Sequence, residues 1–145
     1  MRPLERRTTL VRSFYYASRG LATAWKEERN FRVQLVYLGV VTALFGWLRP
    51  PLTETLVAAL SVSILLTAEL FNTALERAVD LTTIEDHPLA CQAKDLAAGA
   101  VMLTSFVSAG TVLSILFCHN ALEVVVSLGV FLLLLFNVRF GGGRL

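Results

Sequence analysis

Apolar residues are concentrated in four long segments of this chain, and a segment of mixed character precedes them. A transmembrane helix needs about 20 mostly apolar residues, and the first segment is short enough to require tilted neighbours or local thinning of the bilayer. The pattern predicts an all-α integral membrane protein with a single domain over residues 1–145 and a tail at 139–145. The expected spans are residues 33–48, 56–75, 96–117 and 121–138.

The segment before the first span, residues 10–31, has the periodicity of an amphipathic helix. Such a helix lies in the membrane interface, with its apolar side toward the lipid tails. Glu28 is an exception, because it projects from the apolar side and therefore needs a partner inside the protein. The apolar stripe consists of Leu10, Phe14, Ala17, Leu21, Ala24 and Trp25.

The composition supports a membrane protein, and the charges orient it. The chain is 55% hydrophobic and has a mean hydropathy of +0.64, which is too apolar for an ordinary soluble domain of this size. Basic residues crowd the N-terminal fifth and lead directly into a span, so a membrane surface is the expected partner and nucleic acid is not. Arg77 and Lys94 place the loop after the second span on the same, cytoplasmic side. Cys91 and Cys118 are then expected on opposite faces of the membrane.

A row of polar side chains follows one face of the helix that contains the second span. Glu69, Asn72, Glu76 and Asp80 are spaced three, four and four residues apart, so they share one face at about 3.6 residues per turn. Ionisable groups at the edge of a membrane are costly and are usually functional. This row therefore marks the candidate site.

The loop that follows adds further ionisable side chains. Carboxylates together with a lysine suit magnesium and a nucleoside triphosphate, because Mg²⁺ takes few protein carboxylates and completes its shell with water and phosphate oxygens. Lysine supplies a point charge for the phosphates. Walker and protein-kinase motifs are absent from the sequence, so any phosphoryl transfer here belongs to another lineage. The loop residues concerned are Glu85, Asp86, His87, Lys94 and Asp95.

Three motifs in this region resemble a known family. They are E-L-F-N-T-A-L-E-R-A-V-D at 69–80, H-P-L-A-x-x-A-K-D-x-A-A-G-A-V at 87–101, and E-E-R-N-F-R at 27–32. Their combined spacing is similar to that of the small bacterial membrane diacylglycerol kinase and undecaprenol kinase family, and the third motif resembles the undecaprenol kinase branch more. The resemblance implies a homotrimer in the bacterial inner membrane, with three spans and a surface helix per subunit. Its active sites would lie at subunit contacts on the cytoplasmic side, and the span at 121–138 would be extra.

The resemblance also implies roles for individual residues. Glu69 would be the general base that takes the proton from the lipid hydroxyl, and Glu28 and Glu76 would hold the magnesium that bridges the ATP phosphates. Residues that would contact the nucleotide are Tyr16, Glu85, Asp86, His87, Lys94 and Asp95. Asn72 and Asp80 would orient these site residues. The residues that would border the lipid headgroup are Trp25, Phe31 and Arg32. A basic residue that helps to bind the nucleotide in some members would fall near Thr9, which is neutral, and Arg7 or Arg12 is the expected substitute.

The resemblance implies an ATP-dependent lipid kinase that phosphorylates the primary hydroxyl of undecaprenol, with diacylglycerol as the alternative acceptor. A small cation or proton transporter is a rival hypothesis, with Glu69 and Glu76 as a relay. It predicts carboxylates deep in the membrane and no use for Lys94 and Asp95. A non-catalytic assembly subunit is a third hypothesis, and it predicts that Glu69→Gln changes nothing. The carboxylates are at one edge of their span, which favours the kinase.

Overall fold

The part of the chain that the computed structural model describes, residues 10–82 and 87–119 with Val126 and Gly129, is helical throughout its regular structure. The expected span at 121–138 lies outside these residues except for Val126 and Gly129, and the tail at 139–145 lies outside them entirely. The helices within the two long described segments are α1 (Leu10–Glu27), α2 (Arg29–Leu48), α3 (Leu52–Thr82) and α4 (Pro88–Cys118).

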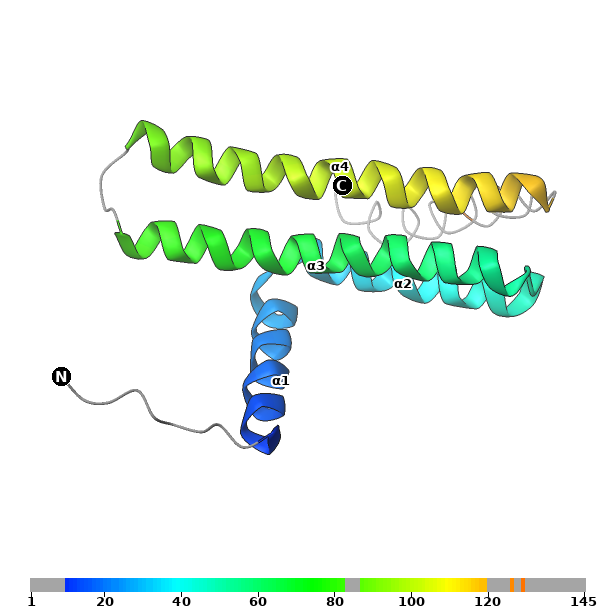
Figure 1. Ribbon diagram of the computed structural model, residues 1–145, viewed down its shortest axis with the longest axis horizontal. Helices are drawn as coiled ribbons and strands as arrows, with labels where there is room; N and C mark the ends of the chain where they lie inside the picture. The colour runs from blue at the N-terminus through cyan, green and yellow to red at the C-terminus, as the bar shows by residue number, and fades with distance from the viewer. Residues whose placement is uncertain (1–9, 83–86, 120–125, 127–128, 130–145) are drawn as a thin grey trace, which may run out of the picture.

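The helices form a bundle with one helix set across it. Figure 1 shows α2, α3 and α4 running alongside one another, with α3 and α4 as an antiparallel pair, while α1 stands across their common direction. The helices α2, α3 and α4 are each long and apolar enough to cross a membrane. This confirms the prediction of an all-α integral membrane protein. The apolar stripe of α1 stays largely uncovered by the rest of the subunit, since only Ala24 is buried, as expected of a helix that lies in the interface.

The surface helix is shorter than its periodicity suggested. It ends at Glu27, and Glu28 follows in an extended conformation (φ −97°, ψ 113°) before α2 begins at Arg29. The Arg32 guanidinium stabilises this corner, because its Nη1 donates to the carbonyl oxygens of Trp25 and Lys26, both at 3.0 Å. Those carbonyls belong to the last turn of α1 and lack partners within the helix. Glu28 therefore sits at a corner between two helices, and not on the apolar side of one continuous helix.

The two long helices exceed the expected spans at the same end of the bundle. Polar residues continue the helical face of α3 to Thr82, beyond the apolar stretch that was expected to end at residue 75. The α4 helix begins at Pro88, whose missing N–H costs nothing in the first turn. His87 caps it, with Nδ1 accepting from the Leu89 backbone N–H at 3.2 Å. This extension carries Glu76, Asp80 and Lys94 beyond the expected spans.

The apolar core lies in the part of the bundle away from the candidate site residues. Its buried side chains come from α2, α3 and α4 and are Val41, Phe45, Ala58, Val112, Ile115 and Leu116. Ser108 is fully buried beside this core, with its Oγ 3.3 Å from the Tyr37 hydroxyl and 3.4 Å from Ser61 Oγ. At the far end, His119 Nε2 lies 2.8 Å from Glu54 Oε2 and links the end of α4 to the start of α3. These contacts link α2, α3 and α4 in the part of the bundle away from the site.

The two cysteines provide a test of the membrane topology. Cys91 and Cys118 are exposed and lie 27 residues apart on α4, which is about 40 Å along a helix. In single-cysteine variants, we expect an impermeant maleimide to label Cys118 in intact cells and Cys91 only in inside-out vesicles. Labelling of both from the same side of the membrane would contradict this topology.

Candidate active site

The buried carboxylate of the site is Glu69, about two turns before residue 75, where the apolar stretch of α3 was expected to end. Only 3% of this residue is exposed. Gln34 of α2 lies against it and donates from Nε2 to Glu69 Oε2 at 3.1 Å. Glu28 and Glu76 are both near enough to interact with Glu69 through their charges. The structure therefore gathers three of the expected acidic residues from α3 and from the corner before α2.

Two amide side chains orient these carboxylates. Gln34 holds Glu69, and Asn72 donates from Nδ2 to Glu76 Oε1 at 2.8 Å. Each amide thereby turns its N–H donors toward an acid, and its own carbonyl oxygen (Gln34 Oε1 and Asn72 Oδ1) is buried with no hydrogen-bond partner among the described residues. Leaving a buried acceptor unpaired costs about 1–3 kcal/mol. The site thus contains acceptor oxygens that a hydroxyl, a water or a hydrated cation would satisfy.

Gln34 is a site residue that the sequence analysis missed. It lies at the start of an apolar span, where a polar side chain is costly and is usually buried against a functional partner. That signal was present in the sequence, but the partner is 35 positions away and only the fold identifies it.

An arginine ties the corner to α3. Arg77 Nη2 lies 2.9 Å from Glu27 Oε2 and 3.2 Å from Glu28 Oε1. Arg77 follows Glu76 directly in the chain, so this ion pair keeps Glu28 beside the segment of α3 that carries Glu76. The partner that Glu28 was expected to need is therefore Arg77.

A second ion pair joins α3 to α4. Lys94 Nζ is paired with Asp80 Oδ1, and Lys94 also lies within electrostatic range of Glu76. Asp95 is exposed on the same turn of α4, and His87 is exposed at its first turn. Glu85 and Asp86 lie outside the described residues. Lys94 and Asp80 thus reach the carboxylate group, whereas no described contact joins Asp95 or His87 to it.

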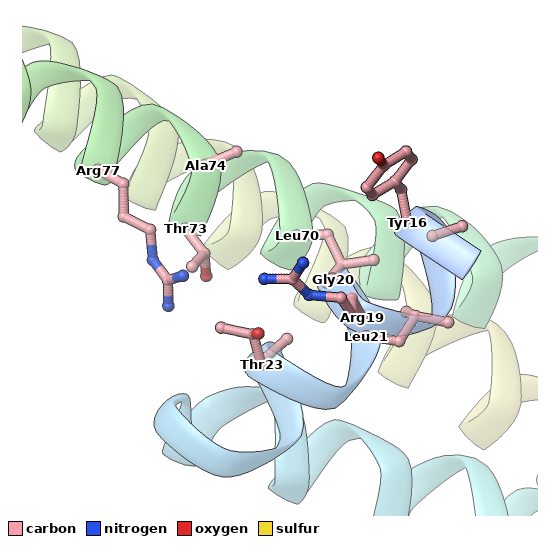
Figure 2. A pocket seen from close by; sticks show the side chains of 11 residues that line it. Tyr16, Arg19, Gly20, Leu21, Thr23, Leu70, Thr73, Ala74 and Arg77 are labelled. Carbon is pink, nitrogen blue, oxygen red and sulfur yellow. The ribbon is translucent and has the colours of Figure 1, made fainter. Parts of the chain in front are cut away.

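A pocket of about 750 Å³ opens between α1 and α3. This volume is in the usual range for a small-molecule site. Figure 2 shows Tyr16 at one end and the guanidinium groups of Arg19 and Arg77 turned toward the space between the two helices. The remaining walls come from small or apolar side chains such as Leu70 and Ala74. The pocket therefore combines a mostly apolar lining with two cations, one of which, Arg77, is paired with Glu27 and Glu28.

The expected lipid-bordering residues are in different environments. Trp25 is 50% exposed on α1 and is free to contact lipid. Phe31 is 4% exposed and packs inside the subunit. The guanidinium of Arg32 is occupied by the last carbonyls of α1. In the single subunit, Arg32 therefore contributes to the corner between α1 and α2, and a role of Phe31 and Arg32 at the lipid headgroup stays a prediction.

The donor set fits magnesium that is shared with a nucleotide. Within residues 10–82 and 87–119, no three His, Cys, Asp or Glu side chains form a closed ligand group. Mg²⁺ typically takes one or two carboxylates and completes its octahedral shell with water and substrate phosphates. Glu28 and Glu76, the latter beside the unpaired Asn72 Oδ1, are hard oxygen donors of the kind that such a site would use.

Comparison with known proteins agrees with the motifs. A family model described as prokaryotic diacylglycerol kinase matches residues 15–117. Undecaprenol kinase of Bacillus subtilis is 36% identical over 97 residues, which cover 67% of this chain and 79% of that protein. Diacylglycerol kinase of Synechocystis sp. is 42% identical over 98 residues (66% and 55%), and that of Escherichia coli K12 is 29% identical over 112 residues (77% and 92%). The chain therefore belongs to the prokaryotic diacylglycerol kinase family and is a membrane-embedded lipid kinase.

Proposed function

We propose that this protein transfers the γ-phosphate of Mg-ATP to the primary hydroxyl of undecaprenol at the cytoplasmic face of the bacterial inner membrane. The observation that carries this proposal is a buried carboxylate, Glu69, held by Gln34 at the apolar edge of an acidic cluster. At this edge, a lipid alcohol could approach Glu69 from the bilayer, and a nucleotide could approach the neighbouring acidic residues from the cytosol.

In the proposed reaction, Glu69 accepts the proton of the lipid hydroxyl. The hydroxyl oxygen then bonds to the γ-phosphorus while the bond from that phosphorus to the β–γ bridging oxygen breaks. The products are the lipid phosphate, ADP and a proton that Glu69 later releases to water. Because the transition state of phosphoryl transfer is loose, positioning and charge neutralisation provide most of the catalysis. Gln34 contributes to positioning by fixing the Glu69 carboxylate.

The remaining side chains would hold the nucleotide and its metal. Glu28 and Glu76 would be the magnesium ligands, and Asn72 would fix the Glu76 carboxylate at 2.8 Å. Bound magnesium would neutralise charge on the β- and γ-phosphate oxygens. Lys94 would give a further positive charge, and its pairing with Asp80 keeps it at the site. The remaining proposed nucleotide contacts are Tyr16, Glu85, Asp86, His87 and Asp95.

We also propose that the active unit is a homotrimer. In the single subunit, large apolar side chains on the outer faces of the spanning helices are widely exposed, such as Leu60 at 62% and Phe106 at 70%. Lipid tails or other copies of the chain must cover these faces. Subunit contacts would also cover Glu28 and Glu76, which are partly exposed in the single chain.

The acceptor lipid is the finer part of the proposal. Undecaprenol is supported by the E-E-R-N-F-R motif and by the relative from Bacillus subtilis, which bears the name undecaprenol kinase. Diacylglycerol is the second candidate, because the relatives from Synechocystis and Escherichia coli bear the name diacylglycerol kinase. A relay transporter is disfavoured, since Lys94 and Asp80 lie with the carboxylates at one end of the bundle.

The test offers both lipids to the purified protein. With γ-labelled ATP and Mg²⁺ in nanodiscs, we expect kcat/KM for undecaprenol to exceed that for diacylglycerol by about tenfold or more, because a preference of that size needs only one or two differing contacts. Equal or greater labelling of diacylglycerol would overturn the choice of acceptor. No labelling of either lipid would overturn the kinase assignment.

A further inference from the structure

Arg77 has a position that its ion pair alone does not explain. Its guanidinium lines the pocket between α1 and α3, where it faces the same space as the guanidinium of Arg19 (Figure 2). Its Nη2 also lies 3.2 Å from Oε1 of Glu28, which is a proposed metal ligand. A cation in contact with such a ligand could also reach phosphates held by the same metal ion.

The carboxylates that pair with Arg77 can be replaced by other anions. The side chains of Arg77, Glu27 and Glu28 are 44%, 61% and 29% exposed. Ion pairs between solvent-exposed side chains contribute little to stability, because water and salt screen them. One of the two partners, Glu28, is itself a proposed metal ligand. A bound nucleotide with its metal can therefore compete for both sides of this pair.

A cation besides Lys94 would help to balance the negative charge of the site. Glu28, Glu69 and Glu76 gather there, and ATP adds several negative charges. Arg32 is engaged by backbone carbonyls, whereas Arg77, like Lys94, is paired with carboxylates that it can exchange for phosphate oxygens. A guanidinium suits the task better than an ammonium, because its planar fork can bind two phosphate oxygens together.

We propose that Arg77, opposite Arg19 in the pocket, is a phosphate-binding residue of the nucleotide site. Its pairing with Glu27 and Glu28 is the state before the nucleotide binds, and Arg77 exchanges those carboxylates for phosphate oxygens. This inference rests on the proposed kinase function and adds to it a residue that contacts the substrate.

The experiment measures binding of Mg²⁺ with a non-hydrolysable ATP analogue to the purified full-length protein, by calorimetry. We expect Arg77→Gln to weaken binding by about tenfold to a hundredfold, the usual effect of losing a charge-assisted hydrogen bond. Arg77→Lys should lose less. Arg49→Gln, at the opposite end of α2, is the matched control and should bind as the wild type does. In turnover assays, Arg77→Gln should raise the KM for ATP and leave the KM for the lipid unchanged.

Glu27→Gln separates this proposal from a purely structural ion pair. If Glu27 competes with phosphate for Arg77, this variant should bind the analogue several-fold more tightly, and the gain should vanish in the Arg77→Gln background. If the pair only braces the corner, Glu27→Gln should weaken binding as Arg77→Gln does, and that result would overturn the proposal. Unchanged binding in Arg77→Gln would overturn it as well. Failure of the wild type to phosphorylate any lipid would instead refute the proposed function.

Discussion

Replacing Glu69 with Gln is expected to lower kcat by about a hundredfold to ten-thousandfold, the range that general base catalysis contributes. The amide cannot take the proton from the lipid hydroxyl, whereas the wild-type carboxylate can. The fold should survive, because Gln has nearly the same shape and its carbonyl can still accept the hydrogen bond from Gln34 Nε2. The measurement is transfer of label from ATP to lipid in nanodiscs, with binding of a non-hydrolysable ATP analogue as the check that the site is intact.

The control for this variant is Glu54→Gln. Glu54 is a partly exposed carboxylate of the same helix, but it lies at the far end of the bundle against His119. Its loss should leave turnover unchanged. Normal turnover in Glu69→Gln would rule out the assignment of the base and would favour the hypothesis of a non-catalytic subunit.

The acidic face of α3 could be predicted from the sequence because it depends on local geometry alone. Glu69, Asn72, Glu76 and Asp80 lie on one continuous helix, so their spacing determines that they share a face. The order and number of the described spans follow in the same way from runs of apolar residues.

The corner at Glu28 could not be predicted from the same kind of pattern. No Gly or Pro marks it, and the amphipathic period continues through it. The break becomes stable through contacts between separate segments, since Arg32 binds the carbonyls that end α1 and Arg77 binds Glu28 from 49 positions away. Periodicity contains no information about such partners.

Gln34 and Arg77 illustrate the same limit at the site itself. In the sequence, Arg77 served only as a positive charge that marks the cytoplasmic side, and Gln34 was one polar residue in an apolar span. The structure places each against a carboxylate of the cluster, across 35 positions for Gln34 and 49 for Arg77. Their roles became visible only when the helices were brought together.

Replacing Glu76 with Gln is expected to raise the Mg²⁺ concentration for half-maximal activity by about tenfold or more, as for other residues that tune metal sites. The amide keeps a carbonyl that can accept from Asn72 Nδ2, so the side chain should hold its place while losing the charge that attracts the cation. Glu28→Ala should have an effect in the same direction.

Because activity alone could fall for other reasons, binding of Mn²⁺ together with the ATP analogue should be followed by electron paramagnetic resonance. Mn²⁺ prefers the same hard oxygen ligands as Mg²⁺. Glu54→Gln again serves as the control with one carboxylate fewer and no change at the site. If Glu28 and Glu76 hold the metal, Mn²⁺ binding should weaken in both Glu76→Gln and Glu28→Ala. Binding in the control should stay normal. Metal titrations that coincide with the wild type would show that these carboxylates do not hold the ion, and the acidic cluster would then need another explanation.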